Sequence, residues 1–246
     1  MIEEAMSKKN RTKTSKTSNG GAKDSKGAGS PNQEMERLPW GWYKIKVDYL
    51  QPFGEAFLLA MVIRTFIIQP FYIPTGSMEP TIHGVQPGGD RIFANKVIYG
   101  IRIPFTERRV FRVRRPRSGD IVVFNTLGLD VKDKEGKNYV KRVVATGGQK
   151  VLIRDGYLYL DGEKTDLHEH TADKHYYNQQ DRGGHPMPYA QGDWVEVPEG
   201  MLFCLGDNSG DSLDSRYWGF VPEQNVLGRA FLRWWPLPRI GLLDRS

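Results

Sequence analysis

The alternation of apolar and polar positions divides the chain into three stretches. Residues 1–37 contain almost no large apolar side chains, so burial cannot offset the entropy of ordering them. Apolar density rises over residues 53–73, where residues 56–68 are interrupted only by Arg64 and Thr65. After residue 74, short apolar runs alternate with Gly, Pro and Asp, and no helical period is sustained. The pattern predicts a disordered tail over residues 1–37, one apolar helix and a mainly β domain.

The apolar stretch and its aromatic flank, which includes Trp40 and Trp42, approach the ~20 residues that a membrane-spanning helix needs. We therefore expect an interfacial segment and a transmembrane helix over residues 38–73. Arg64 would cost roughly 2.5 to 3.5 kcal/mol at the bilayer centre. An amphipathic helix packed on a soluble core is the alternative. About fifty residues precede the apolar run and no small-residue cleavage site follows it, which favours an anchor over a cleaved leader.

Charge sets the expected orientation. The net charge is +6, and ten Lys and Arg residues precede residue 47. The positive-inside rule then predicts a single-pass protein with its N-terminus in the cytoplasm and the residues after Pro74 on the far side of the membrane. A nucleic-acid binder more often carries such charge on a folded face, so no nucleic-acid partner is expected. The single cysteine, Cys204, excludes an intramolecular disulfide and reads as a small buried hydrophobe.

The region after residue 74 is expected to form antiparallel sheets with a smaller inserted β region. Residues 74–160 and 198–246 are assigned to the main β domain. Residues 161–197 are polar and rich in His, Asp and Gly, which predicts a loop-rich insertion. The sequence VLIR, Asp155, Gly156, YLYL predicts a hairpin, because Asp-Gly supplies the positive φ angles of a type I′ turn.

The first candidate for chemistry is Ser77, in the run PTGSMEPT directly after the apolar stretch. Gly76 allows a tight turn between two prolines, so the hydroxyl of Ser77 can be presented near backbone N–H groups that stabilise an oxyanion. A plain surface loop is the alternative.

The second candidate is Lys141, in the strand YVKRVVA. Strand alternation places Lys141 on one face with Tyr139, Val143 and Ala145. Burial on this apolar face can lower the pKa of lysine by up to 3 to 5 units from ~10.4, so that the amine can accept a proton. The alternative is a lysine that reaches solvent from a strand edge.

The third candidate is the segment GDNSGDSLDSRYWG over residues 206–219. Asp214 and Arg216 can form a bidentate ion pair, and Ser212 can orient the lysine amine. A calcium loop competes, because Asp207 begins an alternation of oxygen ligands. It fits poorly, since Trp218 stands where an EF-hand has its bidentate Glu.

Three other features remain open. The histidines at residues 168, 170, 175 and 185 lack a completing ligand set, so no metal site is expected. The basic stretch Arg108 to Arg117 fits either a ribbon near anionic lipid headgroups or a solvated strand face. Trp234 and Trp235 can enter the bilayer or pack on the core.

The three segments together resemble the conserved boxes of type I signal peptidases, and they occur in the same order. The resembling motifs are SMEPT at Ser77, the Lys141-Arg142 pair in a Val-rich strand, and the block over residues 206–219, with support from residues 90–96. The similarity covers most of residues 53–110, 118–160 and 198–238.

The resemblance implies a membrane-bound serine endopeptidase that needs no cofactor and removes signal peptides from exported preproteins. It assigns Ser77 as the nucleophile and Lys141 as the general base. The Ser77 N–H and the Thr75 hydroxyl would form the oxyanion hole. Ser212 would orient the lysine, with Asp214 and Arg216 as structural support for the site.

The resemblance also implies small residues at the first and third positions before the cut, the Ala-X-Ala type. Ile73 and Val140 would line the substrate pocket, where branched aliphatics exclude large side chains. The expected partners are preproteins and the lipid bilayer. Glu79 and the insertion at residues 163–193 depart from the family pattern.

Two rival functions stay open on the sequence. One is a Ser/Lys autoprotease of the repressor-cleaving kind, which normally carries a DNA-binding helix-turn-helix and no membrane span. The other is a membrane-anchored binding module in which the three segments are only structural.

Overall fold

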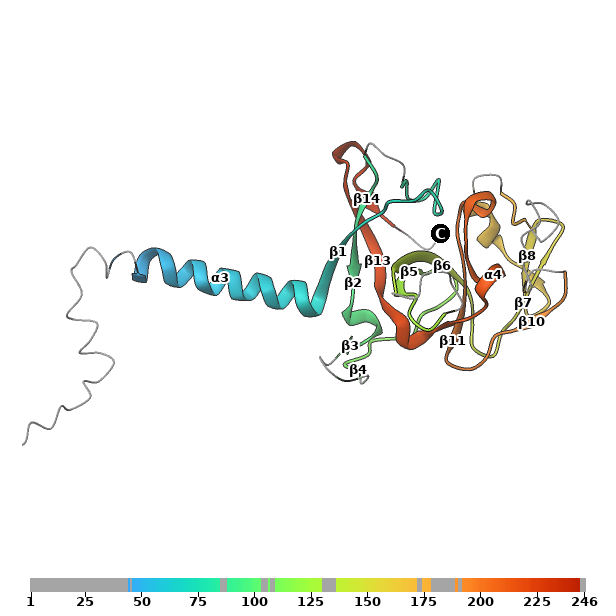
Figure 1. The fold of residues 1–246 in the computed structure, drawn as a ribbon, viewed down its shortest axis with the longest axis horizontal. Coiled ribbons are helices and arrows are strands. Elements are labelled where there is room, and N and C mark those ends of the chain that lie inside the picture. The colour runs from blue at the N-terminus through green and yellow to red at the C-terminus, as the bar shows by residue number, and fades with distance from the viewer. Residues whose placement is uncertain are drawn as a thin grey trace, which may run out of the picture. The chain divides into compact units, whose positions relative to one another are not determined.

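The computed structural model describes residues 44, 46–84, 88–102, 106, 109–129, 136–171, 174–177, 189 and 192–243. The tail expected over residues 1–37 lies outside these residues. Contacts between Cα atoms divide the chain into two units, residues 1–54 and residues 55–246. Every strand among the residues just given lies in the second unit, so the description below concerns mainly that unit (Figure 1).

One helical run precedes the strands. It consists of a π-helical turn at Lys46–Leu50, the α-helix α3 at Gln51–Val62 and a second π-helical turn at Ile63–Ile67. The run has 22 residues with a mean hydropathy of 1.4 in its apolar window, and none of that window is buried. Its length and composition suit a membrane span.

The expected end of the transmembrane helix at residue 73 is wrong. The helical run ends at Ile67, and Ile68–Tyr72 form strand β1, which pairs antiparallel with β2 from Ile68↔Asn95 to Tyr72↔Arg91. Pro70 explains the boundary: proline has no N–H to donate, so it is poorly suited to a helix interior but is tolerated in an edge strand. β1 is such an edge.

The main sheet has eight strands, all paired antiparallel. Its order is β1-β2-β13-β5-β6-β11-β12, with β14 paired to β13. The prediction of a mainly β fold of antiparallel sheets is therefore confirmed, and the ribbon curls around β5 and β6 (Figure 1). The strands are β1 (Ile68–Tyr72), β2 (Arg91–Asn95), β5 (Ile121–Asn125), β6 (Asn138–Thr146), β11 (Met201–Leu205), β12 (Val221–Pro222), β13 (Val226–Trp235) and β14 (Gly241–Leu242).

A smaller sheet has the order β10-β7-β8-β9. Its strands are β7 (Lys150–Arg154), β8 (Tyr157–Leu160), β9 (Glu163–Lys164) and β10 (Val195–Glu196). The turn between β7 and β8 is confirmed as a two-residue loop, with φ of 52° at Asp155 and 79° at Gly156. The predicted start of the inserted region at residue 161 is wrong. Strand β7 pairs with both β8 and β10, so the small sheet begins at Lys150.

The remaining elements are short. A two-stranded ribbon is formed by β3 (Ile101–Arg102) and β4 (Arg109–Val110). The helical turns are η3 (Val97–Tyr99), η4 (Asp166–His170), η6 (Ser209–Asp211), α4 (Ser215–Trp218), η7 (Glu223–Asn225) and η8 (Leu237–Arg239).

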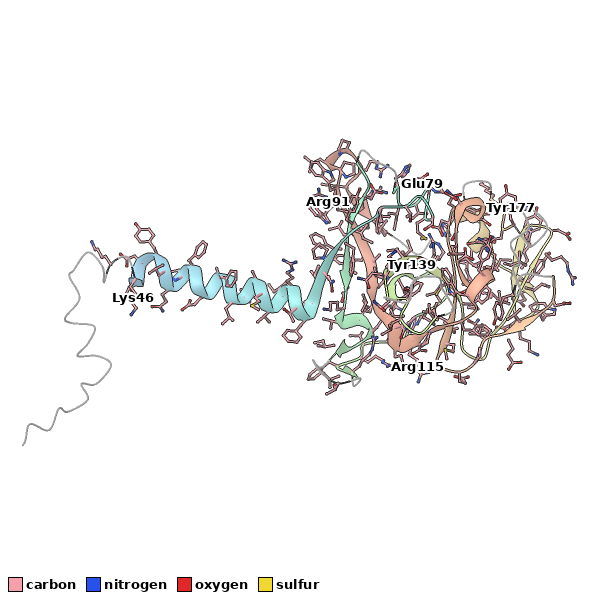
Figure 2. All side chains as sticks on the ribbon, viewed as in Figure 1. Lys46, Glu79, Arg91, Arg115, Tyr139 and Tyr177 are labelled. Atoms are coloured by element: carbon pink, nitrogen blue, oxygen red, sulfur yellow. The ribbon has the colours of Figure 1, made fainter. Side chains whose placement is uncertain are left out.

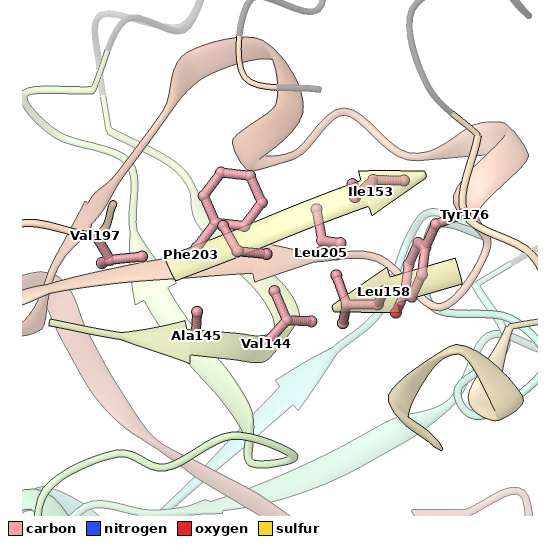
Figure 3. Packing of buried hydrophobic residues seen from close by; sticks show 9 residues of the cluster. Val144, Ala145, Ile153, Leu158, Tyr176, Val197, Phe203 and Leu205 are labelled. Carbon is pink, nitrogen blue, oxygen red and sulfur yellow. The ribbon is translucent and has the colours of Figure 1, made fainter. Parts of the chain in front are cut away.

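A shared hydrophobic core joins the two larger sheets. Val144 and Ala145 of β6 and Phe203 and Leu205 of β11 pack with apolar residues of the small sheet and its loops (Figure 3). A second cluster, which contains Ile73, Met78 and Ile92, lies under the start of the chain segment that carries Ser77. The small sheet is therefore packed onto the main sheet rather than linked to it only by loops.

Candidate active site

Ser77 lies on an excursion of the chain between β1 and β2. The base of the excursion is closed by a backbone hydrogen bond of 3.0 Å from Ile73 to Asp90, and its tip by one of 3.0 Å from Glu79 to Gly76. Gly84 lies against the backbone of Thr75: a Cβ built on Gly84 would lie 1.8 Å from the Thr75 carbonyl oxygen. These contacts hold Ser77 on a tight turn at Gly76, as the sequence predicted.

Lys141 lies in β6, opposite Val122 of β5. Its side chain is only 3% exposed, and a hydrogen bond of 2.6 Å joins its Nζ to Ser77 Oγ. Burial lowers the pKa of Lys141 to about 8; Asp214 opposes this shift and Arg216 adds to it. The nucleophile and base suggested by the sequence are thus brought together, 64 residues apart in the chain.

Asp214 and Arg216 form the bidentate ion pair that the sequence predicted. Arg216 Nε and Nη2 each donate to an Asp214 carboxylate oxygen at 2.8 Å, and both residues are fully buried. Burial would raise the pKa of Asp214, but Arg216 and Lys141 together hold it below its usual value. Asp214 also accepts from the N–H of Gly206, so the pair fixes the segment that passes beside Ser77.

Ser212 is buried close to the dyad, but its expected contact with Lys141 is not formed. Its hydroxyl makes no hydrogen bond to any described part of the chain. A Cβ built on Gly206 would lie 2.2 Å from Ser212 Oγ and 2.4 Å from the Ser77 carbonyl oxygen. Ser212 therefore borders the same small space as Ser77, and its part in orienting the lysine stays a prediction.

The expected pocket residues belong to one apolar cluster. Ile73 is buried, and half-buried Val140, the neighbour of Lys141, packs against the same cluster. Met78, directly after Ser77, is a buried member of it. Thr75, the expected second oxyanion donor, is exposed. Ile73, Met78 and Val140 thus share one apolar cluster, and their part in a substrate pocket stays a prediction.

Asp207 is a site residue that the sequence did not assign. Its carboxylate accepts from Arg142 Nε at 2.8 Å and Nη2 at 2.7 Å, and from Thr81 Oγ1 at 2.6 Å. Arg142 follows Lys141 and Thr81 follows Ser77 by four residues, so Asp207 ties together the two segments that carry Ser77 and Lys141. The calcium-loop alternative is wrong for this residue, because both carboxylate oxygens are already occupied by Arg142.

Asn208 makes the second unassigned contact. Its backbone N–H donates to the Ser77 carbonyl oxygen at 3.1 Å, and its side-chain Nδ2 donates to the Gly76 carbonyl oxygen at 3.0 Å. Asn208 therefore holds the peptide groups on both sides of Ser77. The only sign in the sequence that Asn208 holds these carbonyl groups was its place directly after Asp207.

The structure also shows the environment of two features outside the site, Cys204 and the Trp234–Trp235 pair. Cys204 is fully buried, and burial raises the pKa of its thiol, as expected for a small hydrophobe. Trp234 stacks on Phe93 with ring centroids 5.5 Å apart, so it packs on the sheet, while Trp235 is exposed.

Comparison with known proteins places this site in a family. The family model described as signal peptidase, peptidase S26, matches residues 46–235. "Probable signal peptidase I-2" of Synechocystis sp. is 38% identical over 189 residues, which cover 76% of this chain and 72% of that protein. Signal peptidase I of Pseudomonas fluorescens is 34% identical over 227 residues, covering 80% of this chain and 76% of that protein. A solved signal peptidase I from Enterococcus faecalis V583 is 30% identical, covers 47% of this chain and 97% of its own, and has a TM-score of 0.35.

The match to the family model and the identity to curated relatives agree over most of the chain. The chain belongs to the signal peptidase family, peptidase S26. It is a serine protease of this family, and the resemblance drawn from the three sequence segments is confirmed.

Proposed function

We propose that the protein is a membrane-bound serine endopeptidase that removes N-terminal signal peptides from exported preproteins by a Ser/Lys dyad. The contact of 2.6 Å between Lys141 Nζ and Ser77 Oγ carries this proposal. Ser77 Oγ attacks the scissile carbonyl carbon while neutral Lys141 takes the hydroxyl proton. The protonated lysine then gives that proton to the leaving amine, and water releases the acyl group from Ser77.

The burial of Lys141 supports its role as the base. At a pKa of about 8, a useful fraction of the amine is neutral near neutral pH, whereas an exposed lysine would be almost fully charged. No histidine is needed for this proton transfer. The Asp214–Arg216 pair, fully buried, keeps the surrounding segment in place without giving Lys141 an ion-pair partner at contact distance.

The oxyanion hole of the proposed reaction uses the Ser77 N–H, with the Thr75 hydroxyl as the second donor. Asn208 holds the carbonyl groups of Gly76 and Ser77 by hydrogen bonds of 3.0 and 3.1 Å. Fixing these two peptide planes also fixes the direction of the Ser77 N–H, which is the preorganisation that oxyanion stabilisation requires. The buried hydroxyl of Ser212, which makes no hydrogen bond to the described residues, would orient the Lys141 amine in this proposal.

Cleavage after small residues follows from the residues next to the dyad. Ile73 and Val140 pack in one cluster, and branched side chains there leave room for Ala but not for larger groups. Substitution of half-buried Val140 by Ala should permit cleavage after larger residues than Ala, whereas Val226→Ala, in a separate cluster, should not. Sequencing of products from a preprotein with a varied residue before the cut measures this directly.

Membrane attachment is proposed for the helical run Lys46–Ile67. At a rise of 1.5 Å per residue, its 22 residues extend about 33 Å, close to the ~30 Å of a hydrocarbon core. Large apolar side chains such as Phe53, Phe57 and Leu58 are exposed along it, which suits lipid better than packing on a soluble core. The ten basic residues before residue 47 favour a cytoplasmic N-terminus in the inner membrane and an extracytoplasmic catalytic domain.

The deciding experiment is incubation of the full chain with a labelled preprotein, followed by sequencing of the new N-terminus. Ser77→Ala and Lys141→Met should each lose processing while the protein stays folded and membrane-bound. The control Lys150→Met changes an exposed lysine of β7 and should process normally. Normal processing by Ser77→Ala would instead support the binding-module alternative, and retained turnover in Lys141→Met would exclude the dyad.

A further inference from the structure

The segment that follows β4 presents a regular outward face. Residues 111–117 lie outside the strands and helices, and Phe111, Val113, Arg115 and Arg117 are all exposed, with Phe111 80% and Val113 71% exposed. Of the residues between them, Arg112 is also exposed and lies 3.8 Å from the Glu223 carboxylate, whereas Arg114 is half-buried and Pro116 is buried. We call the four outward residues the 111–117 ridge; it has an apolar half and a cationic half.

The ridge is held firmly from beneath. Arg114 N–H donates to the Ile98 carbonyl oxygen at 3.0 Å, and the Arg114 guanidinium binds both oxygens of buried Asp120 at 2.6 and 2.9 Å. The N–H of Arg117 also donates to Asp120 at 3.0 Å. The segment is therefore an ordered display of its outward side chains.

Exposure of Phe111 has no explanation within the described chain. Its φ of 54° lies in the left-handed region, which is unfavourable for a residue with a Cβ, and most of its side chain faces solvent. An unfavourable backbone angle that holds an apolar ring in water points to a partner outside the fold.

The charge of the ridge restricts that partner. Arg115 and Arg117 have no ion-pair partner among the described residues, and the nearby carboxylate of Asp120 is buried and engaged by Arg114 and Arg229. Figure 2 shows Arg115 at the opposite end of the catalytic unit from Glu79, the second residue after Ser77. The ridge is thus separate from the substrate site.

We propose that the 111–117 ridge binds an anionic lipid surface, with Phe111 and Val113 entering the interface and Arg115 and Arg117 pairing with headgroup phosphates. Basic residues are attracted to anionic headgroups, and apolar side chains gain by leaving water at the same surface. This second membrane contact rests on the proposed anchoring by the helical run. A second copy of the chain is the competing occupant.

A site-specific fluorescent probe tests the proposal in the full chain. Cys204 is the only cysteine in the sequence and is fully buried, so Val113→Cys can be labelled selectively with an environment-sensitive dye. The protein is reconstituted into phosphatidylcholine vesicles with and without phosphatidylglycerol. In the anionic vesicles we expect a blue-shifted emission and at least twofold stronger quenching by nitroxide-labelled lipid than for a probe at Glu163→Cys, an exposed position of β9.

Charge reversal supplies the matched control. Arg115→Glu with Arg117→Glu should abolish the difference between the two vesicle types, whereas Lys150→Glu with Arg154→Glu, two exposed basic residues of β7, should leave it unchanged. Equal quenching at both probe positions, with the protein present in the vesicle fraction, would overturn the ridge proposal alone. A blue shift that appears in detergent and grows with protein concentration would assign the ridge to a second copy. Absence of the protein from the vesicle fraction would overturn the anchoring proposal, and this inference with it.

Discussion

The side-chain amide of Asn208 donates a hydrogen bond of 3.0 Å to the carbonyl oxygen of Gly76. The same residue holds the carbonyl oxygen of Ser77 through its backbone N–H. The segment after β11 therefore sets the orientation of the peptide groups on both sides of the proposed nucleophile, although it lies 132 residues away in the chain.

Asn208→Ala should slow catalysis more than it weakens substrate binding. A hydrogen bond of this kind contributes about 1 kcal/mol, so we expect kcat to fall about fivefold with a smaller change in KM. Asn225→Ala is the matched control, because Asn225 Nδ2 also donates to two backbone carbonyls, at 3.1 and 2.9 Å, away from the dyad. Equal effects of the two substitutions on kcat would contradict a positioning role for Asn208.

The activity should rise with pH as Lys141 loses its proton. With a pKa of about 8, kcat/KM should increase about tenfold per pH unit below that value and level off above it. At pH 6 the rate should be about 1% of the plateau, because only that fraction of the amine is neutral. A profile from pH 6 to pH 10 with a labelled peptide measures the apparent pKa, and a flat profile would exclude the neutral lysine as the base.

Lys141→Met should make the folded protein more stable at neutral pH while it abolishes turnover. The folded state lowers the pKa of Lys141 from 10.5 to about 8, so the unfolded chain binds the proton more strongly. The stability of the wild type therefore rises with pH between about 8 and 10.5, and below 8 the charged lysine costs roughly 3 kcal/mol. Urea unfolding at pH 7 and pH 10.5 should show the gain from Met shrinking at the higher pH; a gain independent of pH would contradict this assignment.

Asp207→Asn should destabilise the protein and reduce its activity. The change leaves the buried Arg142 guanidinium, only 1% exposed, without its charged partner, for which a loss of about 3 to 5 kcal/mol is expected. Lys141 is the neighbour of Arg142, so the rate should fall as well. Glu196→Gln breaks the exposed pair with Lys150 and should change the unfolding free energy by less than about 0.5 kcal/mol. Comparable losses in the two variants would argue against Asp207 as the tie between the catalytic segments.

Gly156→Ala should destabilise the small sheet more than Gly162→Ala does. Both glycines have positive φ, 79° and 98°, but a Cβ on Gly156 would lie 1.7 Å from His175 Nδ1, while nothing lies within 4 Å of one on Gly162. Both variants carry the backbone cost of roughly 1 kcal/mol, and only Gly156→Ala adds a steric clash. Thermal unfolding should separate them, and His175→Ala should relieve part of the Gly156→Ala defect.

Local patterns in the sequence were sufficient for several parts of the fold and the site. The Asp155-Gly156 turn, the Asp214–Arg216 pair and the burial of Lys141 depend on residues that are close in sequence or on one strand. The partners of Asp207 are 65 and 126 residues away, and an isolated Asp-rich segment fits cation binding as well as it fits an arginine. The role of Asp207 could therefore be recognised only from the folded structure.

The boundary of β1 shows a second limit. Ile68–Tyr72 continue the apolar run of the helix, so composition alone assigns them to the membrane segment. Only their pairing with β2, from Ile68↔Asn95 to Tyr72↔Arg91, separates strand from helix. The small sheet was misplaced for the same reason, since β10 joins β7 across the long insertion.

The direct passage from the helical run into β1 also limits how far Ser77 can lie from the end of the helical run. Ser77 is the tenth residue after Ile67, and ten fully extended residues reach at most about 36 Å. In the proposed anchoring, with the helix held in a bilayer, this short connection limits the distance between the lipid surface and Ser77, whichever substrate is bound. A peptide bond that emerges beyond that height stays out of range even when small residues precede it.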